Sequence, residues 1–170
     1  MAILAVALVI LLLLVAAGHD LMVRRIPDVL AVGIALAGLV LRIADGPTAM
    51  AASLLAALAL FAALFAAFAA GVLGGGDVKL ATAVAIGLPP AGVWSLVVAT
   101  CLAGGVLSLL YILAQRLPRV AAPAPRRPSG LLGRFLSVER WRIRRRGPLP
   151  YAVAIAAGGI LTLVNTASAG

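Results

Sequence analysis

The chain has 170 residues, 64% of them hydrophobic, and a formal net charge of +9. Its mean hydropathy of +1.19 excludes an ordinary soluble domain, because such domains are only about 45–50% apolar. The apolar residues form unbroken blocks, which excludes the short alternating strands of a membrane β-barrel. We therefore predict a single membrane-embedded domain over residues 1–170, an all-α polytopic helix bundle.

Six apolar segments follow one another along the chain, and each predicts a helix that crosses or enters the membrane. They cover residues 2–18, 28–43, 48–72, 78–88, 91–115 and 149–166. The fourth ends at Leu88-Pro89-Pro90, because proline donates no amide hydrogen and disfavours a helical residue before it. That segment is shorter than the roughly 20 residues of a membrane span. We expect a half-depth helix that its neighbours shield from lipid.

The first segment has a second interpretation, as a cleavable signal peptide. Val15-Ala16-Ala17 resembles a cleavage site of small residues. No basic residue precedes the segment, however, and its apolar run is longer than the ~7–15 residues of a signal core. We therefore favour a first membrane helix.

The basic residues predict the orientation. Of the 14 lysines and arginines, ten are arginines between positions 116 and 146. Three more fall on the same side of the predicted topology: Arg24, Arg25 and Lys79. Only Arg42 falls on the opposite side. The positive-inside rule then puts the loop 116–148 in the cytosol and both termini outside.

The arginine-rich loop 116–148 carries most of the net charge. Within it, apolar residues recur at helical spacing over 131–146, and the arginines crowd toward the end. This pattern predicts a short interfacial helix on the inner leaflet, which anchors the protein or contacts its substrate. Anionic lipid is the expected counter-charge, so the net charge needs no nucleic-acid partner.

Two of the five acidic residues, Asp20 and Asp77, are candidate catalytic residues. An acid beside a membrane-spanning segment is costly and suggests a function. The predicted topology puts both on the cytosolic side, where they can face each other if the first and fourth helices are neighbours. Two close carboxylates do not both ionise readily, so one keeps a proton. An aspartic protease uses this state: the anion activates a water and the acid protonates the scissile carbonyl.

The acids also have purely structural interpretations. Asp77 directly precedes the fourth helix, where aspartate is a preferred N-cap. Asp20 can be a plain interfacial residue, although the helix dipole disfavours negative charge at a helix C-terminus. Asp28 is expected to cap the second helix. Asp45, followed by Gly46 and Pro47, is expected to be a turn residue on the far side.

Three glycines, Gly74, Gly75 and Gly76, precede Asp77. Glycine lets another chain approach closely, so we predict that the run binds the extended backbone of a peptide; the alternative is a flexible loop. Lys79 is assigned to the same substrate site. Its other interpretations are a snorkelling lysine or a charge that biases the protonation of the acids. His19 is either a hydrogen-bond donor beside Asp20 or a solvated loop residue.

The single cysteine, Cys101, excludes an internal disulfide and a cysteine-based zinc site. We expect it to be a small packed apolar side chain. No metal and no cofactor are predicted.

Three stretches together point to one family. Residues 20–28 contain an aspartate followed by Ile-Pro and then Asp, residues 74–80 read GGGDVKL, and residues 148–158 contain Pro-Tyr-x-x-Ala-Ile-Ala-x-Gly. The combination resembles the type IV prepilin peptidases, membrane aspartic proteases marked by a Gly-x-Gly-Asp motif. It spans nearly the whole chain and is more specific than any one motif.

The resemblance implies that Asp20 and Asp77 are the catalytic dyad. It implies a substrate as well, a prepilin whose short basic leader is removed at the cytosolic face of the bacterial inner membrane. Larger members of the family carry an additional region with Cys-x-x-Cys pairs and also methylate the new terminus. This sequence has no such pair, so methylation is not implied. The compact form resembles the peptidases of Flp (tight-adherence) pilus systems.

Two other functions remain open. The first is a related peptidase that acts on pseudopilins or archaellin-like precursors. The second is a non-enzymatic transport or assembly subunit whose acids relay protons or cap helices.

Overall fold

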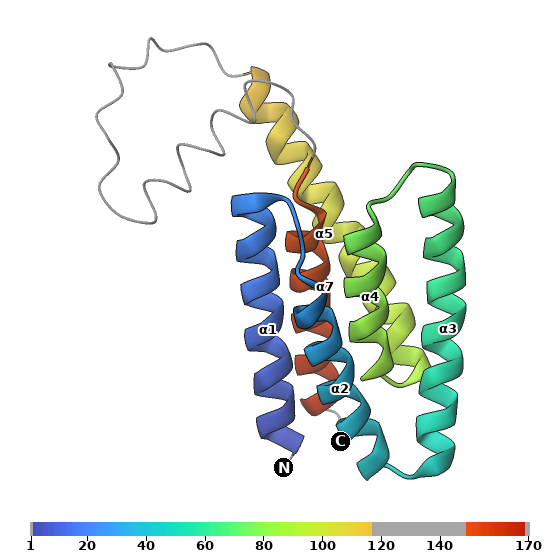
Figure 1. Ribbon diagram of the computed structural model, residues 1–170. Coiled ribbons are helices and arrows are strands. Elements are labelled where there is room, and N and C mark those ends of the chain that lie inside the picture. Colours follow the sequence, from blue (N-terminus) through green and yellow to red (C-terminus); the bar gives the residue numbers. More distant parts are fainter. Residues whose placement is uncertain (1, 117–148, 169–170) are drawn as a thin grey trace.

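A computed structural model describes residues 2–116 and 149–168 (Figure 1). In this part of the chain all secondary structure is helical. The helices are α1 (Ala2–Val23), α2 (Asp28–Ala44), α3 (Pro47–Ala69), α4 (Gly75–Ile86), α5 (Pro90–Arg116) and α7 (Tyr151–Ser168). The predicted all-α bundle is confirmed. The predicted interfacial helix over 131–146 lies outside the described residues.

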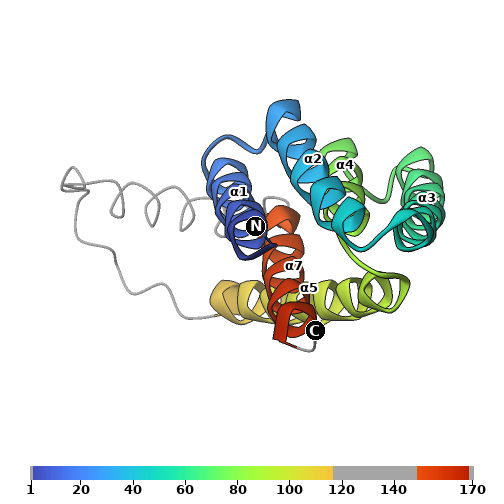
Figure 2. The ribbon, with the colours of Figure 1, turned by 90° about the horizontal axis from the view of Figure 1, so that it is seen from below.

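Successive helices run in opposite directions, so the start of α1 and the end of α7 lie at the same end of the bundle (Figure 1). Seen along the bundle, α7 occupies the middle, with α1, α2 and α4 to one side of it and the steeply tilted α5 on the other (Figure 2). α7 packs against α5, α1 and α4. The α1–α2 loop and the α3–α4 loop both lie at the end opposite to the termini.

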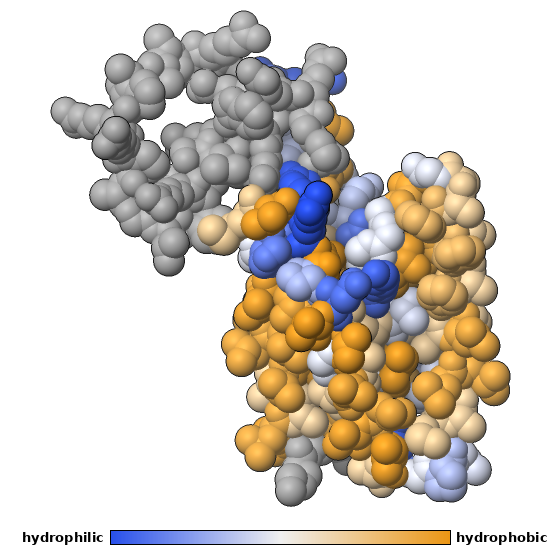
Figure 3. All heavy atoms as spheres, in the orientation of Figure 1, coloured by the Kyte–Doolittle hydropathy of each residue, from blue (hydrophilic) through white to orange (hydrophobic). Residues whose placement is uncertain are grey.

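Four of the described helices are long and apolar enough to cross a membrane: α1, α3, α5 and α7. α2 has 17 residues and α4 has 12. Apolar side chains cover most of the visible bundle surface, and hydrophilic ones gather toward the end that holds the α1–α2 loop (Figure 3). A surface of this kind fits lipid along its sides, and the protein is a multi-pass membrane protein.

α4 is a buried helix that is too short to span a bilayer. Its 12 residues rise about 18 Å at roughly 1.5 Å each, against a hydrocarbon core of about 30 Å. Five of its apolar residues are buried: Val78, Leu80, Ala83, Val84 and Ala85. The helices α2, α3 and α7 pack around it. Its neighbours therefore shield it, as the sequence led us to expect.

Small residues allow close approaches between helices at two places. A Cβ atom built on Gly38 of α2 would lie 2.8 Å from the Cα and the N atoms of Gly87, at the end of α4. A Cβ atom on Gly158 of α7 would lie 2.7 Å from the backbone nitrogen of Thr100 on α5. At both places one backbone lies directly against another, so the glycines set the spacing of the helices.

One expectation about packing was wrong. Cys101 is exposed on α5 rather than packed in the bundle. α5 is tilted against the bundle and buries only Gly92, Val93, Leu96 and Tyr111. The sequence of α5 is apolar on all sides, so it gave no sign of which face would point outward.

Candidate active site

Asp20 lies in the last turn of α1 and is 8% exposed. It is one of three buried polar residues in the described ranges, together with Ser53 and Thr162. The sequence placed it just after the helix, but the helix continues to Val23. A carboxylate here loses much of its hydration and sits at the negative end of the helix dipole. Both effects cost free energy, which argues against a plain interfacial role.

Asp77 is the third residue of α4, and the N-cap is Gly74. The interpretation of Asp77 as the N-cap is therefore wrong. Its carboxylate instead accepts a hydrogen bond from the backbone N–H of Gly74. This is one half of a capping box, because the N-cap glycine has no side chain to return a bond. The bond holds the carboxylate against the start of α4.

The pKa of Asp77 is raised from 3.8 to about 6. Burial is the largest cause, and the negative charge of Asp20 is the second. The hydrogen bond from Gly74 and the positive charge of Arg24 act in the opposite direction. Asp77 lies outside the four candidate spans. The two acids are thus close enough for the charge of one to disfavour the charge of the other.

The acids come together without direct packing between their helices. We expected the acids to meet if the first and fourth helices are neighbours. In the described structure α1 and α4 do not form one of the well-packed helix pairs. Each packs instead against α2 and α7. The side chains of Leu13 on α1 and Val84 on α4, for example, both lie within 3.4 Å of a Cβ built on Gly159 of α7. These two intervening helices therefore set the distance between the acids.

Gly74 is exposed, while Gly75 and Gly76 are half-buried against neighbouring side chains. A Cβ atom on Gly74 would lie 2.9 Å from Oδ2 of Asp77, one on Gly75 would lie 3.4 Å from the ring of Phe68, and one on Gly76 would lie 3.4 Å from Ile26. Gly75 and Gly76 are the first two residues of α4. Ile26 belongs to the first sequence motif and Gly76 to the second, so the two motifs meet here. The predicted role of these glycines in substrate binding stays a prediction.

Sequence reasoning missed Arg24. It follows the end of α1 with a φ of 58°, the one non-glycine residue of the described chain with a positive φ. Its backbone N–H donates to the carbonyl of Asp20 at 2.9 Å, which closes the helix with a left-handed residue. Its charge lowers the pKa of Asp77. The one sign of this role in the sequence is its place four residues after Asp20.

Lys79 and Asp28 form an ion pair. The Nζ of Lys79 lies 2.9 Å from Oδ1 of Asp28, and their side chains are 56% and 71% exposed. The pair links the first residue of α2 to α4, two residues beyond Asp77. The expected capping role of Asp28 is wrong, because the N-cap of α2 is Pro27 and no side chain caps it. The predicted substrate contact of Lys79 stays a prediction.

His19 is neither a solvated loop residue nor a partner of Asp20. It lies inside α1, and its Nδ1–H donates to the backbone carbonyl of Arg25. The bond fixes the turn that follows α1. In residues 2–116 and 149–168, no group of three His, Cys, Asp or Glu side chains is placed to hold a metal ion.

A comparison with protein families identifies the family of this chain. The model of the type IV leader peptidase family matches residues 7–109, a stretch that contains both Asp20 and Asp77. No curated protein and no solved structure matches the chain. The family match covers more than half of the sequence. The chain therefore belongs to the type IV leader peptidase family, and it is a membrane peptidase.

Proposed function

We propose that this peptidase is of the aspartic type, with Asp20 and Asp77 as its catalytic dyad. The observation that carries the proposal is the electrostatic interaction between two partly or fully buried acids at one end of the bundle. A proton relay needs acids that pass a proton along a path. Here Asp20 is the acid whose charge acts on Asp77, while Asp28 at the same end is exposed and paired with Lys79.

The raised pKa assigns the roles. Asp77 holds the proton more strongly than an ordinary aspartate, so it is the general acid and Asp20 is the general base. Asp20 takes a proton from a water molecule, and the resulting hydroxide attacks the scissile carbonyl carbon while Asp77 protonates the carbonyl oxygen. The tetrahedral intermediate then breaks its C–N bond. Asp20 gives its proton to the leaving nitrogen, and Asp77 recovers its own from the hydroxyl.

The proposed substrate is a type IV prepilin of the Flp kind, and the bond cut is the one that releases its short basic leader. The family match supports a leader peptide as the target class. The arginine-rich loop supports a cytosolic site at the inner membrane. Anionic lipid of the inner leaflet is the proposed counter-charge of that loop.

Co-expression with a candidate Flp-type prepilin tests the proposal, with cleavage read from the shift of the prepilin on a gel. We expect complete processing by the wild-type chain and none by Asp20→Asn or Asp77→Asn, because one carboxyl group cannot supply both acid and base. Asp28→Asn is the matched control: the same substitution at the same end, on an exposed side chain.

Three results decide the outcome. Loss of cleavage in both dyad variants, with cleavage kept in Asp28→Asn, supports the aspartic mechanism. Graded activity in either dyad variant would reject it. An unprocessed Flp-type prepilin together with a processed pseudopilin would keep the dyad and overturn the substrate.

A further inference from the structure

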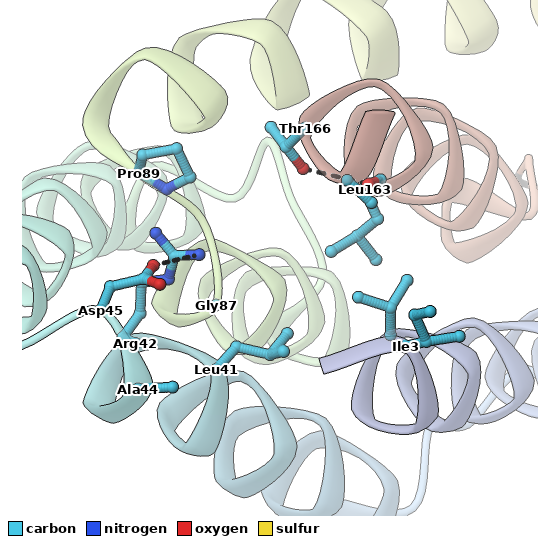
Figure 4. Close-up of a pocket in the computed structure, with 11 residues that line it drawn as sticks. Ile3, Leu41, Arg42, Ala44, Asp45, Gly87, Pro89, Leu163 and Thr166 are labelled. Atoms are coloured by element: carbon cyan, nitrogen blue, oxygen red, sulfur yellow. Dashed lines mark hydrogen bonds and ion pairs between the residues drawn. The ribbon is translucent and has the colours of Figure 1, made fainter. Parts of the chain in front are cut away.

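A pocket of about 660 Å³ lies at the end of the bundle opposite to the two acids (Figure 4). It exists because α4 ends early, so that Gly87 and Pro89 form one of its walls. Other walls come from the start of α1 and the ends of α2 and α7. The volume falls within the roughly 300–1,000 Å³ of typical small-molecule sites.

The pocket combines apolar walls with one pair of opposite charges. Ile3 and Leu163 lie on one side of it, and Arg42 and Asp45 lie across from them (Figure 4). The guanidinium of Arg42 lies 2.9 Å from Oδ2 of Asp45, and the two side chains are 18% and 47% exposed. Arginine has five N–H donors, and the Nε of Arg42 is buried with no hydrogen-bond partner in the described part of the chain. The site therefore has a guanidinium whose terminal N–H groups one carboxylate does not saturate, and a carboxylate that is half open.

We propose that this pocket binds a phospholipid with a zwitterionic ethanolamine headgroup. Its phosphate accepts hydrogen bonds from Arg42, its ammonium donates to Asp45, and one acyl chain lies along Ile3, Val6 and Leu163. The ends of the helices lie at the depth of the lipid headgroups in a bilayer. The headgroup therefore lies at the depth of Arg42 and Asp45, and the acyl chain lies at the depth of the apolar walls.

Charge complementarity selects this headgroup over the common alternatives. The Arg42–Asp45 pair is neutral overall, and so is a phosphoethanolamine group. A phosphoglycerol head has no cation, so its phosphate would be repelled by Asp45. A phosphocholine head carries a cation without an N–H group, so it cannot donate to the carboxylate. Bonds between charged donors and acceptors are stronger than neutral ones, and only the ethanolamine head makes both.

The test is lipid retention. The full-length protein is placed in nanodiscs with equal parts of phosphatidylethanolamine, phosphatidylglycerol and phosphatidylcholine and extracted into mild detergent. The lipids that remain bound are counted by native mass spectrometry. We expect wild type to retain phosphatidylethanolamine several-fold over the other two. Arg42→Gln should lose this preference. Asp45→Asn should shift it to phosphatidylglycerol, because an uncompensated guanidinium then remains.

Two controls make the same chemical changes at the other end of the bundle, Arg116→Gln and Asp28→Asn, and both should retain the wild-type lipid. Equal retention of the three lipids by wild type would overturn the proposal. Retention by Arg42→Gln and Asp45→Asn like that of the controls would overturn it as well.

A second measurement needs only the wild-type protein, so it holds even if a variant fails to fold. Phosphatidylethanolamine with a photoreactive group in one acyl chain is cross-linked in the nanodisc, and the labelled peptides are mapped. We expect labels near Ile3 and Val6 on α1 and near Leu163 on α7. Labels confined to other lipid-facing surfaces, or a pocket filled by water and left unlabelled, would overturn the proposal.

Discussion

The contact between Gly38 and Gly87 yields the sharpest prediction about the fold. A Cβ atom on Gly38 would lie 2.8 Å from backbone atoms of Gly87, and ordinary contact begins at 3.4 Å. Gly38→Ala therefore forces the two backbones apart by about 0.6 Å, the difference between those values. Backbone cannot swing aside as a flexible side chain can. Inserting a methyl group into such a contact costs about 1–3 kcal/mol.

Gly105→Ala is the matched control. Gly105 also lies inside a helix, α5, and a Cβ atom there would meet nothing within 4 Å. Both variants gain the same helix propensity, about 1 kcal/mol for alanine over glycine. That gain cancels when the two are compared, so Gly38→Ala should be less stable than Gly105→Ala by the overpacking cost alone, about 1–3 kcal/mol.

Reversible unfolding in mixed detergent micelles measures both free energies against wild type. We expect Gly105→Ala to be at least as stable as wild type and Gly38→Ala to be the less stable of the pair. Equal free energies of unfolding for the two variants would refute the backbone contact. They would also mean that some other contact sets the position of α4 against α2.

Four further predictions concern the site and its surroundings. Gly74→Ala places a Cβ 2.9 Å from Oδ2 of Asp77, so the carboxylate must move away from the Gly74 amide, whose hydrogen bond lowers the pKa of Asp77. We therefore expect slower cleavage and a higher pKa of Asp77. An unchanged pH–rate profile would contradict this. With Asp77 as the proposed general acid, cleavage by wild type should fall as the pH rises through about 6, because Asp77 then loses its proton. Arg24→Gln removes a positive charge that lowers the pKa of Asp77, so the loss of cleavage should begin at a higher pH than in wild type. If the loss begins at the same or a lower pH, Asp77 is not the group whose titration limits cleavage. The Lys79–Asp28 pair is exposed, so the ion pair should contribute little to stability. A double-mutant cycle with Lys79→Met and Asp28→Asn should give a coupling free energy of unfolding of at most ~1 kcal/mol, and high salt should reduce it. A coupling free energy well above that would show a stronger link between α2 and α4.

The sequence predicted the structure best at residues that are costly to place in a membrane, such as charged ones, or that restrict the backbone, such as proline. Asp20 and Asp77 are rare charges beside long apolar segments, so composition alone marked them, and Pro89 fixed the early end of α4. The order and direction of the helices followed from the lengths of the apolar runs. These features depend on local chemistry, which a single sequence carries.

Features that depend on packing could not be predicted. The end of α1 was placed at residue 18, yet the helix runs to Val23, because no proline or strong breaker intervenes and Arg24 adopts a left-handed conformation. The pairing of Lys79 with Asp28 joins residues 51 positions apart, and nothing local indicates it. The exposure of Cys101 depends on the tilt of α5. The contribution of Arg24 to the pKa of Asp77 required the three-dimensional arrangement of α1 and α4.

The up-and-down course of the helices has a practical consequence. The first residue of α1 and the last of α7 emerge together, at the end remote from the two acids (Figure 1). An epitope or fluorescent reporter fused beyond either helix would stand at the far end of the bundle from the proposed catalytic acids. Such fusions should leave turnover intact, and the accessibility of the reporter in sealed vesicles would reveal which compartment faces the catalytic chemistry.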